Sequence, residues 1–276
     1  MSQSLTAVQQ IEYDALVKAE YKSKGFRLRD AVRTKHDIVG ASCDFRKVGE
    51  VISVATAFQQ AVTAQDPGYA KATANLVKYT TPIAVDSIQE LTVNFDSKME
   101  SAMLIADAMG RRSDQITIDA LDANPGTTVP NGGTNMTYAK YTQIIENFEE
   151  NAVPLEERFV AMSGNNFNKL LQADEFTSTF YTANRVLDKG MIREYLGINL
   201  IIIPNMTEGG LPLAGNIRSC FAWHKMAVGC ALGTNFRTEI NYIPEKTSWL
   251  ANGLFYAGAV VVDNVGVLKI DCDESA

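Results

Sequence analysis

The longest regular pattern of apolar positions lies between residues 95 and 123. The apolar residues recur at steps of three and four, as on one face of a helix: Ala102, Ile105, Ala106, Met109, Ile116 and Ala120. Ser97 and Glu100 form an S-x-x-E capping box, and Asn124-Pro125-Gly126 ends the segment. We therefore expect a helix of about 26 residues, about 39 Å long. The narrow stripe favours a long surface helix, although an ordinary long helix of an enzyme would give the same pattern.

The chain before this helix contains one short helical pattern and two strand patterns. Thr6 and Gln9 open an amphipathic helix that closes near Gly25. The first strand-rich run contains Phe45, Val48, Val51, Ile52, Val54 and Ala57, and the second contains Leu76, Val77, Tyr79, Thr81, Ile83 and Val85.

A polar segment, 59–75, joins the two strand-rich runs and contains the turn signature Gln65-Asp66-Pro67-Gly68. The runs therefore predict an extended hairpin with this turn and Tyr69 at its tip. Because an isolated hairpin is barely stable in water, we expect another subunit to support it. The alternative, a hairpin folded back onto a sheet of its own chain, stays open.

The chain after the long helix alternates between helical and strand patterns. Helices are expected over 138–151, 165–172 and 224–232, and strands over 158–162, 198–203 and 220–223. The segment 207–215 is interpreted as a loop too polar to lie in the core. This alternation predicts an α/β layer domain.

The C-terminal region is rich in strand patterns. Strands are expected over 236–243, 249–262 and 265–270. They need a partner, and the long helix offers an apolar face, so we expect the strands to pack against it. Residues 136–233 would then form a domain inserted between the helix and these strands.

Charge is distributed unevenly along the chain. The 276 residues, 46% of them hydrophobic, are enough for a full core, and a net charge of −7 argues against a general nucleic-acid-binding protein. In the segment 17–36, however, seven basic residues outnumber two acidic ones, which gives this segment +5 and leaves −12 for the remainder. One end of the chain is therefore a basic arm on an acidic body.

The sequence lacks the signals of secretion and membrane insertion. The N-terminus has no basic segment followed by an apolar one, and the longest uncharged run, 247–262, is shorter than the roughly 20 residues that span a bilayer. We expect a soluble protein made in a cytoplasm. Cys43, Cys220, Cys230 and Cys272 stand at unrelated spacings and are interpreted as buried or free thiols.

No catalytic or metal-binding constellation stands out in the sequence. His36 and His224 have no metal-ligand spacing, His224 is interpreted as a partly buried structural residue, and nucleophile-elbow and phosphate-loop motifs are absent. The paired carboxylates Glu149-Glu150 and Glu156-Glu157 are typical of solvated faces. We expect no catalytic residue, metal or cofactor, and interpret the arm, hairpin and long helix as parts that contact copies of the same chain.

The order of these parts resembles the major capsid proteins of tailed double-stranded DNA bacteriophages, which have the Hong Kong 97 fold. The resemblance rests on the N-terminal arm, the hairpin FRKVGEVISVATA with NLVKYTTPIAV, the helix FDSKMESAMLIADAMGRRSDQITIDAL, the α/β insertion and the closing run FRTEINYIPEKTSWLANGLFYAGAVVVDNVGVLKID. It implies a mixed α+β fold with an N-arm (1–36), an E-loop (37–94), a P-domain (95–135 and 234–276) and an inserted A-domain (136–233).

The resemblance also implies a structural shell protein without catalytic residues. Its copies would assemble as hexamers and pentamers into an icosahedral head that encloses double-stranded DNA without sequence-specific binding. The protein would be made in the bacterial cytoplasm and reside in the virion, with no membrane contact. Because about 36 residues before the hairpin leave no room for a folded scaffolding domain, we expect a separate scaffolding protein, with portal and decoration proteins as further candidate partners.

Three groups of residues are expected to contact other subunits: the hairpin tip, the basic arm, and a loop near a symmetry axis. They are Gln65, Asp66, Pro67, Gly68, Tyr69, Arg27, Arg29, Arg33, Glu208, Gly209 and Gly210. The arm either contacts DNA or scaffold on the inner face or straps across the acidic body of a neighbour. We favour the strap, because opposite charges orient partners.

Two other functions fit the sequence less well. An encapsulin-like nanocompartment shares the fold and differs in its cargo. A small-molecule enzyme in the α/β insertion would need a deep polar pocket with perturbed titratable groups.

Overall fold

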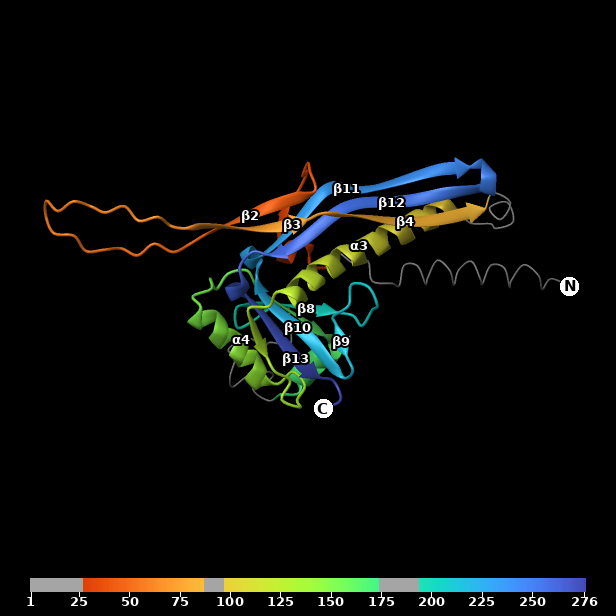
Figure 1. Cartoon of the computed structure of the whole chain (residues 1–276). Helices are drawn as coiled ribbons and strands as arrows, with labels where there is room; N and C mark the ends of the chain where they lie inside the picture. Colours follow the sequence, from red (N-terminus) through yellow and green to blue (C-terminus); the bar gives the residue numbers. More distant parts are fainter. Residues whose placement is uncertain (1–26, 87–96, 174–193) are drawn as a thin grey trace.

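The computed structural model describes residues 27–86, 97–173 and 194–276, which form an elongated upper layer, a lower unit and a long projecting loop (Figure 1). The α-helices in these ranges are α3 (Ser97–Ala123), α4 (Tyr138–Glu150) and α5 (Gly164–Leu171). Short 3-10 turns are η1 (Arg29–Ala31), η2 (Lys225–Ala227), η3 (Pro244–Lys246) and η4 (Asn264–Gly266). The helix expected near residues 6–25 lies outside the described residues.

Helix α3 runs along the upper layer and ends above the lower unit (Figure 1). Its 27 residues begin at the capping box and end before Asn124-Pro125, as the sequence predicts. Ile105 and Met109 are buried in its first half, but Ala106, expected in the apolar stripe, is exposed. In the second half the buried set broadens to include Asp114 and Thr117. The helix is therefore a surface helix only over part of its length.

The upper layer is a four-stranded sheet in the order β1-β11-β12-β4. Its strands are β1 (Arg33–Lys35), β4 (Val77–Asp86), β11 (Val228–Ile243) and β12 (Ser248–Val261). β12 packs directly on α3: a Cβ added at Gly253 would collide with the side chain of Ile105 and lie 2.5 Å from Sδ of Met109. The expectation that C-terminal strands cover the long helix is thus confirmed for β12.

Two expectations for this sheet are wrong. Strand β4, expected to be the second arm of the hairpin, pairs with β12 instead, from Val77↔Ala257 to Asp86↔Ser248. The segment 224–232, expected to be a helix, contains η2 and the start of β11. Strand β11 lies between β1 and β12, and its first, apolar residues are buried. Because a short buried apolar run is compatible with either a strand or a helix, the periodicity of the sequence cannot distinguish the two.

The lower unit is built on a mixed sheet in the order β5-β13-β10-β6-β8-β7, with β9 beside β10. Its strands are β5 (Thr127–Val129), β6 (Arg158–Ser163), β7 (Glu194–Tyr195), β8 (Ile198–Ile203), β9 (Leu213–Ala214), β10 (Ile217–His224) and β13 (Val267–Asp273). Helix α4 lies beside this sheet and buries Tyr141, Ile144 and Phe148 (Figure 1). The expected α/β layers are therefore present.

Strand β13, which we grouped with the C-terminal strands that cover the long helix, pairs with β10 in the lower sheet, from Ile217↔Asp273 to Trp223↔Val267. The lower sheet therefore combines strands from both sides of the proposed 233/234 boundary. The indole of Trp223 donates a hydrogen bond to the carbonyl oxygen of Ala31 at 2.8 Å, and Leu28 and Val32 belong to the main core. We expected residues 27–36 to belong to an arm, but these contacts attach them to the body.

Candidate assembly interface

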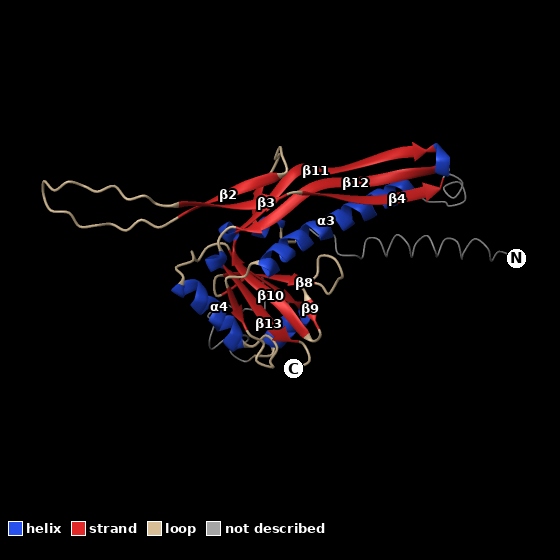
Figure 2. Cartoon of the chain, viewed as in Figure 1, coloured by secondary structure: helices blue, strands red, loops and turns tan. Residues whose placement is uncertain are grey.

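The projecting part of the molecule is a hairpin of β2 (Ser42–Val48) and β3 (Tyr69–Asn75), joined by the loop 49–68 (Figure 2). The hairpin register runs from Ser42↔Asn75 to Val48↔Tyr69. An extended hairpin is thus present, but its second strand is the segment 69–75, which we had placed in the polar connection. The apolar alternation of β4 was the stronger signal, yet that strand belongs to the upper sheet.

The base of the hairpin is anchored by Phe45, whose side chain is fully buried. Its ring covers Gly229 of β11 so closely that an added Cβ would lie 2.7 Å from ring atoms. Cys43, Ala74, Leu76 and Ala231 complete a small cluster that is separate from the main core: these five residues form a hydrophobic core of their own. The hairpin is therefore attached to the body through a local contact.

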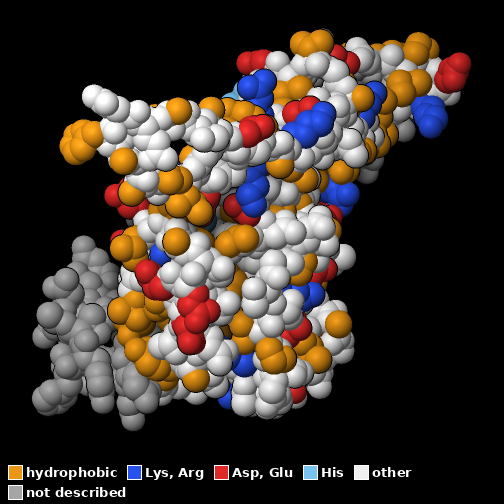
Figure 3. All heavy atoms as spheres, turned by 60° about the vertical axis from the view of Figure 1, so that its left-hand side comes forward, with side chains coloured by type: hydrophobic (Ala, Val, Ile, Leu, Met, Phe, Trp, Pro, Cys, Tyr) orange, Lys and Arg blue, Asp and Glu red, His pale blue; other side chains and the backbone are white. Residues whose placement is uncertain are grey.

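The loop 49–68 projects away from the body and carries exposed apolar side chains. Ile52 is 76% exposed, Phe58 105% and Val62 80%. Residues of this loop donate hydrogen bonds to one another, including the bond from the Gly49 backbone N–H to the Gly68 carbonyl at the neck of the loop. Figure 3 shows hydrophobic side chains at the end of the projecting segment. Such a loop is typical of a surface that another molecule covers.

The chain reverses direction near residues 57–60, so the expected position of the tip is wrong. Gln60 N–H donates to the Ala57 carbonyl at 3.2 Å, and Gln59 has a positive φ of 65°. The Asp66-Pro67-Gly68 signature does form a bend, in which Gly68 N–H donates to the Asp66 carboxylate at 3.2 Å. That bend lies at the neck, where it directs the chain into β3. Contact of residues 65–69 with another subunit stays a prediction.

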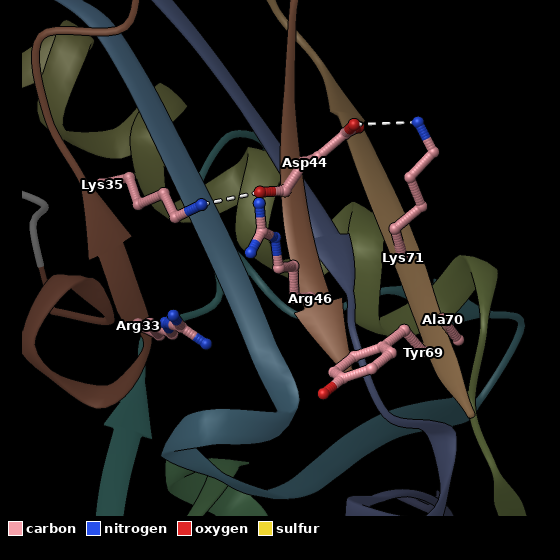
Figure 4. Close-up of a pocket in the computed structure, with 7 residues that line it drawn as sticks. All are labelled: Arg33, Lys35, Asp44, Arg46, Tyr69, Ala70 and Lys71. Carbon is pink, nitrogen blue, oxygen red and sulfur yellow. Dashed lines mark hydrogen bonds and ion pairs between the residues drawn. The ribbon is translucent and has the colours of Figure 1, made fainter. Parts of the chain in front are cut away.

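A cationic groove lies between β1 and the base of the hairpin (Figure 4). We define the groove by the residues that line it: Arg33, Lys35, Asp44, Arg46, Tyr69, Ala70 and Lys71. Its volume is about 720 Å³. Asp44 is the one carboxylate among these lining residues, so cations dominate the groove.

Both carboxylate oxygens of Asp44 accept hydrogen bonds from residues of β3. The carboxylate accepts a hydrogen bond from the Thr73 hydroxyl at 2.6 Å and an ion-paired one from Lys71 Nζ at 2.9 Å. These two contacts, in that order, lower the pKa of Asp44. Lys35 Nζ donates to the Asp44 carbonyl oxygen at 2.6 Å and lies 4.6 Å from the centroid of the Phe45 ring. Among the described residues, Arg33 and Arg46 have no ion-pair partner.

The three arginines expected in the arm do not share one surface. Arg27 donates from its guanidinium to the Ile202 carbonyl at 2.6 Å, and its backbone N–H donates to Asp114. Burial raises the pKa of Asp114, against the backbone donors of Arg27 and Leu28. Arg29 lies in η1, and Arg33 lines the groove. Contact of these arginines with another subunit stays a prediction.

The loop that contains Glu208, Gly209 and Gly210 lies against α3. Glu208 pairs with Arg112 at 3.7 Å, and Gly209 N–H donates to the side chain of Gln115 at 2.9 Å. Both glycines are buried, so the expectation that this whole loop lies outside the core is wrong for them. Glycine has no side chain and can approach the helix backbone closely. A position near a symmetry axis stays a prediction.

The C-terminal end is held by a buried charge pair in the lower unit. Arg218, 3% exposed, pairs with Glu274, which also accepts a hydrogen bond from the Ser163 hydroxyl at 2.7 Å. Burial alone would raise the pKa of Glu274, but these hydrogen bonds and the arginine charge lower it overall. The contacts link β6, β10 and the segment after β13.

Other chemistry-bearing groups have structural contacts. The four cysteines are free and buried, as interpreted from the sequence. His224, 9% exposed, accepts a hydrogen bond from the Met226 backbone N–H at 3.2 Å. Within the described ranges, no group of three or more His, Cys, Asp or Glu side chains could hold a metal ion, and no helix is long and apolar enough to cross a membrane.

Sequence reasoning missed Phe58, Lys35, Arg46 and Lys71 as surface residues. For Arg46 the available signal was the alternation in β2, where Cys43 and Phe45 are buried while Asp44 and Arg46 are exposed. Phe58 carried no such signal, because a lone aromatic residue in a polar segment is equally compatible with a core position.

Comparison with solved structures defines the class of fold. The head structure of Helicobacter pylori bacteriophage KHP40 matches with a TM-score of 0.69 and 12% identity, covering 87% of this chain and 88% of that one. The capsid of Cyanophage P-SCSP1u matches with a TM-score of 0.67 and 14% identity, covering 89% of this chain and 87% of that one. Mycobacterium phage Che8 matches with a TM-score of 0.67 and 16% identity, covering 86% of each chain. The chain therefore has the fold of phage capsid proteins.

The sequence itself supplies the family. The sequence model of the family described as phage capsid protein matches residues 5–274, and the chain belongs to this family. Comparison with curated protein sequences finds no match. The protein is a phage major capsid protein, a structural component of the virion shell.

Proposed function

We propose that copies of this chain assemble as hexamers and pentamers into the icosahedral head of a tailed bacteriophage, which encloses double-stranded DNA without sequence-specific contacts. The observation that carries the proposal is the loop 49–68, which extends from the body and exposes Ile52, Phe58 and Val62. Burying one such side chain contributes about 1.5–3 kcal/mol, before the cost of ordering the loop. A neighbouring copy that covers the loop would gain this energy.

The proposal assigns a role to each part. The loop contacts an adjacent subunit, the arm straps across the acidic body of a neighbour, and the loop around Glu208 lies near a symmetry axis. The proposed division into arm, E-loop, P-domain and A-domain departs from the boundaries expected from the sequence in three places: residues 27–36 contact the body, β4 belongs to the upper sheet, and β13 completes the sheet of the A-domain. A scaffolding protein, portal and decoration proteins act with it in the host cytoplasm, and the chain has no enzymatic activity.

Electron microscopy of the expressed protein tests the assembly. We expect uniform polyhedral shells, and double-stranded DNA inside virions distinguishes a phage head from a nanocompartment. Wild-type protein that remains a single folded subunit at high concentration in every buffer would contradict the proposal.

The variant Phe58→Asp tests the role of the loop. It should reduce the yield of shells without lowering the melting temperature of the subunit, because Phe58 is fully exposed in the isolated chain. Val39→Asp is the matched control, since Val39 is 98% exposed outside this loop. Shells of Phe58→Asp in wild-type yield would show that the loop tip is not an assembly contact.

A further inference from the structure

The cationic groove holds two arginines, Arg33 and Arg46, that have no ion-pair partner among the residues that the structure describes. Lys71 pairs with Asp44, and Lys35 donates to the Asp44 carbonyl oxygen. Arg33 has the Phe45 ring 5.8 Å from its guanidinium carbon, and Arg46 is exposed. In Figure 4 these side chains come from three strands, β1, β2 and β3, and they line one groove. An anion placed there would be within reach of several donors.

The register of the hairpin makes this arrangement unfavourable in the isolated chain. Arg46 and Lys71 lie directly opposite each other on β2 and β3. Like charges at directly opposed positions destabilise a strand pair. The single carboxylate of Asp44 is already engaged with Lys71 and Thr73, so it does not neutralise Arg46. A bound anionic group would relieve this repulsion.

We propose that the cationic groove receives carboxylates of a second copy of this chain, an inference that rests on the proposed assembly. A copy of the chain presents more acidic than basic groups, with 32 Asp and Glu against 25 Lys and Arg. The lower unit carries a visible cluster of acidic side chains (Figure 3). Glu150, at the end of α4, and Glu156, shortly before β6, are exposed and have no ion-pair partner among the described residues, which makes them the first partners to test.

Protein carboxylates fit the groove better than DNA does. The lining includes the aromatic ring of Tyr69 and the methyl group of Ala70, which can pack against the apolar part of a glutamate side chain. Asp44 adds a fixed negative charge inside the groove, so a continuous row of phosphates would meet repulsion, whereas a single carboxylate can bind beside Arg46. The groove therefore suits a local contact between subunits.

Zero-length carbodiimide crosslinking tests the contact directly. Isotopically heavy and light protein would be mixed before assembly, and crosslinked peptides identified by mass spectrometry. We expect heavy-light links from Lys35 or Lys71 to Asp or Glu of the other copy, at least tenfold depleted in the unassembled fraction. The Lys71–Asp44 pair, at 2.9 Å within one chain, gives the internal light-light control.

Charge reversal gives the second measurement. Arg46→Glu should raise the protein concentration needed for half-maximal assembly by about tenfold or more, because juxtaposed like charges cost several kcal/mol. Arg46→Lys should restore assembly, and Lys169→Glu, at an exposed position on α5, is the control of equal charge change.

The outcomes separate this inference from the proposed function. Shells without heavy-light links from the groove, or Arg46→Glu shells formed at the wild-type concentration, would overturn the groove contact while assembly stands. Normal assembly with reduced DNA content in Arg46→Glu virions would assign the groove to nucleic acid instead. Failure of the wild type to assemble would reject the proposed function and this inference with it.

Discussion

Replacing Phe45 by alanine should release the hairpin from the body without unfolding the main core. Phe45 is the largest side chain in the small cluster that joins β2 and β3 to β11. Its ring covers Gly229, and the Lys35 ammonium lies 4.6 Å from the ring centroid. The truncated side chain would leave a cavity over a residue that has no side chain to fill it.

The burial of Phe45 and its contact with Lys35 indicate the size of this effect. Truncating a fully buried phenylalanine typically costs about 3–5 kcal/mol, and the lost cation–π contact adds about 0.5–1 kcal/mol at a partly exposed site. The cluster has only five buried residues, and the other apolar side chains that pack on it are partly buried, so the loss of the largest buried one weighs heavily. We therefore expect the free energy of local opening of the hairpin to fall by about 3–5 kcal/mol.

Amide hydrogen exchange of the unassembled subunit measures this effect. Protection of β2 and β3 should fall by a factor of about 100 or more, while β10 in the main core keeps its protection. Phe58→Ala is the matched control, because it makes the same change at an exposed position of the same hairpin. Equal loss of protection in β10 and β2 would refute the idea of a separate anchor, and unchanged protection in β2 would refute the role of Phe45.

Three further predictions concern the body. Gly253→Ala should lower the melting temperature in calorimetry, because the added methyl group collides with Ile105 and overpacking costs about 1–3 kcal/mol; an unchanged melting temperature would contradict this packing. Asp114→Ala removes the acceptor of the buried Leu28 N–H and should cost about 1–3 kcal/mol in urea unfolding; an unchanged free energy of unfolding would contradict the role of this hydrogen bond. The fold lowers the pKa of Glu274, so the stability that its carboxylate contributes is fully present above its usual pKa of 4.5 and is lost as the pH falls through the folded pKa. Glu274→Gln should therefore flatten the dependence of the free energy of unfolding on acid pH. An equally steep profile would assign this dependence to other groups.

The sequence predicted the elements whose signals are local. Helix α3 follows from the capping box and the Asn124-Pro125 stop, and strand β8 follows from an apolar run, interrupted only by Asn199, that ends at Pro204. Both ends of each element carry residues that favour termination in any context. Such signals act within a few residues, so they do not depend on contacts with distant parts of the chain.

The partners of the strands and the groove depended on contacts between distant residues. Nothing near Val77 indicates that β4 pairs with β12, some 170 residues later, rather than with β2. Likewise, Arg33 and Arg46 join one groove only because β1 pairs with β11 and Phe45 then docks on the same strand. The bend at Asp66 was recognised from sequence, but its place at the neck follows from the register of β2 and β3.

The small anchor and the exposed loop are related consequences of the proposed assembly. If Phe58 and Ile52 packed on their own body, burial there would compete with burial against a neighbour, and the net gain on assembly would fall. Keeping them exposed leaves the full gain for the contact between copies, while Phe45 and the small cluster around it, together with the Lys47–Asp263 ion pair, hold the base of the hairpin on the body. The same reasoning explains why an unneutralised Arg46 is tolerated beside Lys71: the repulsion in the free subunit becomes attraction when a carboxylate of another copy enters the groove.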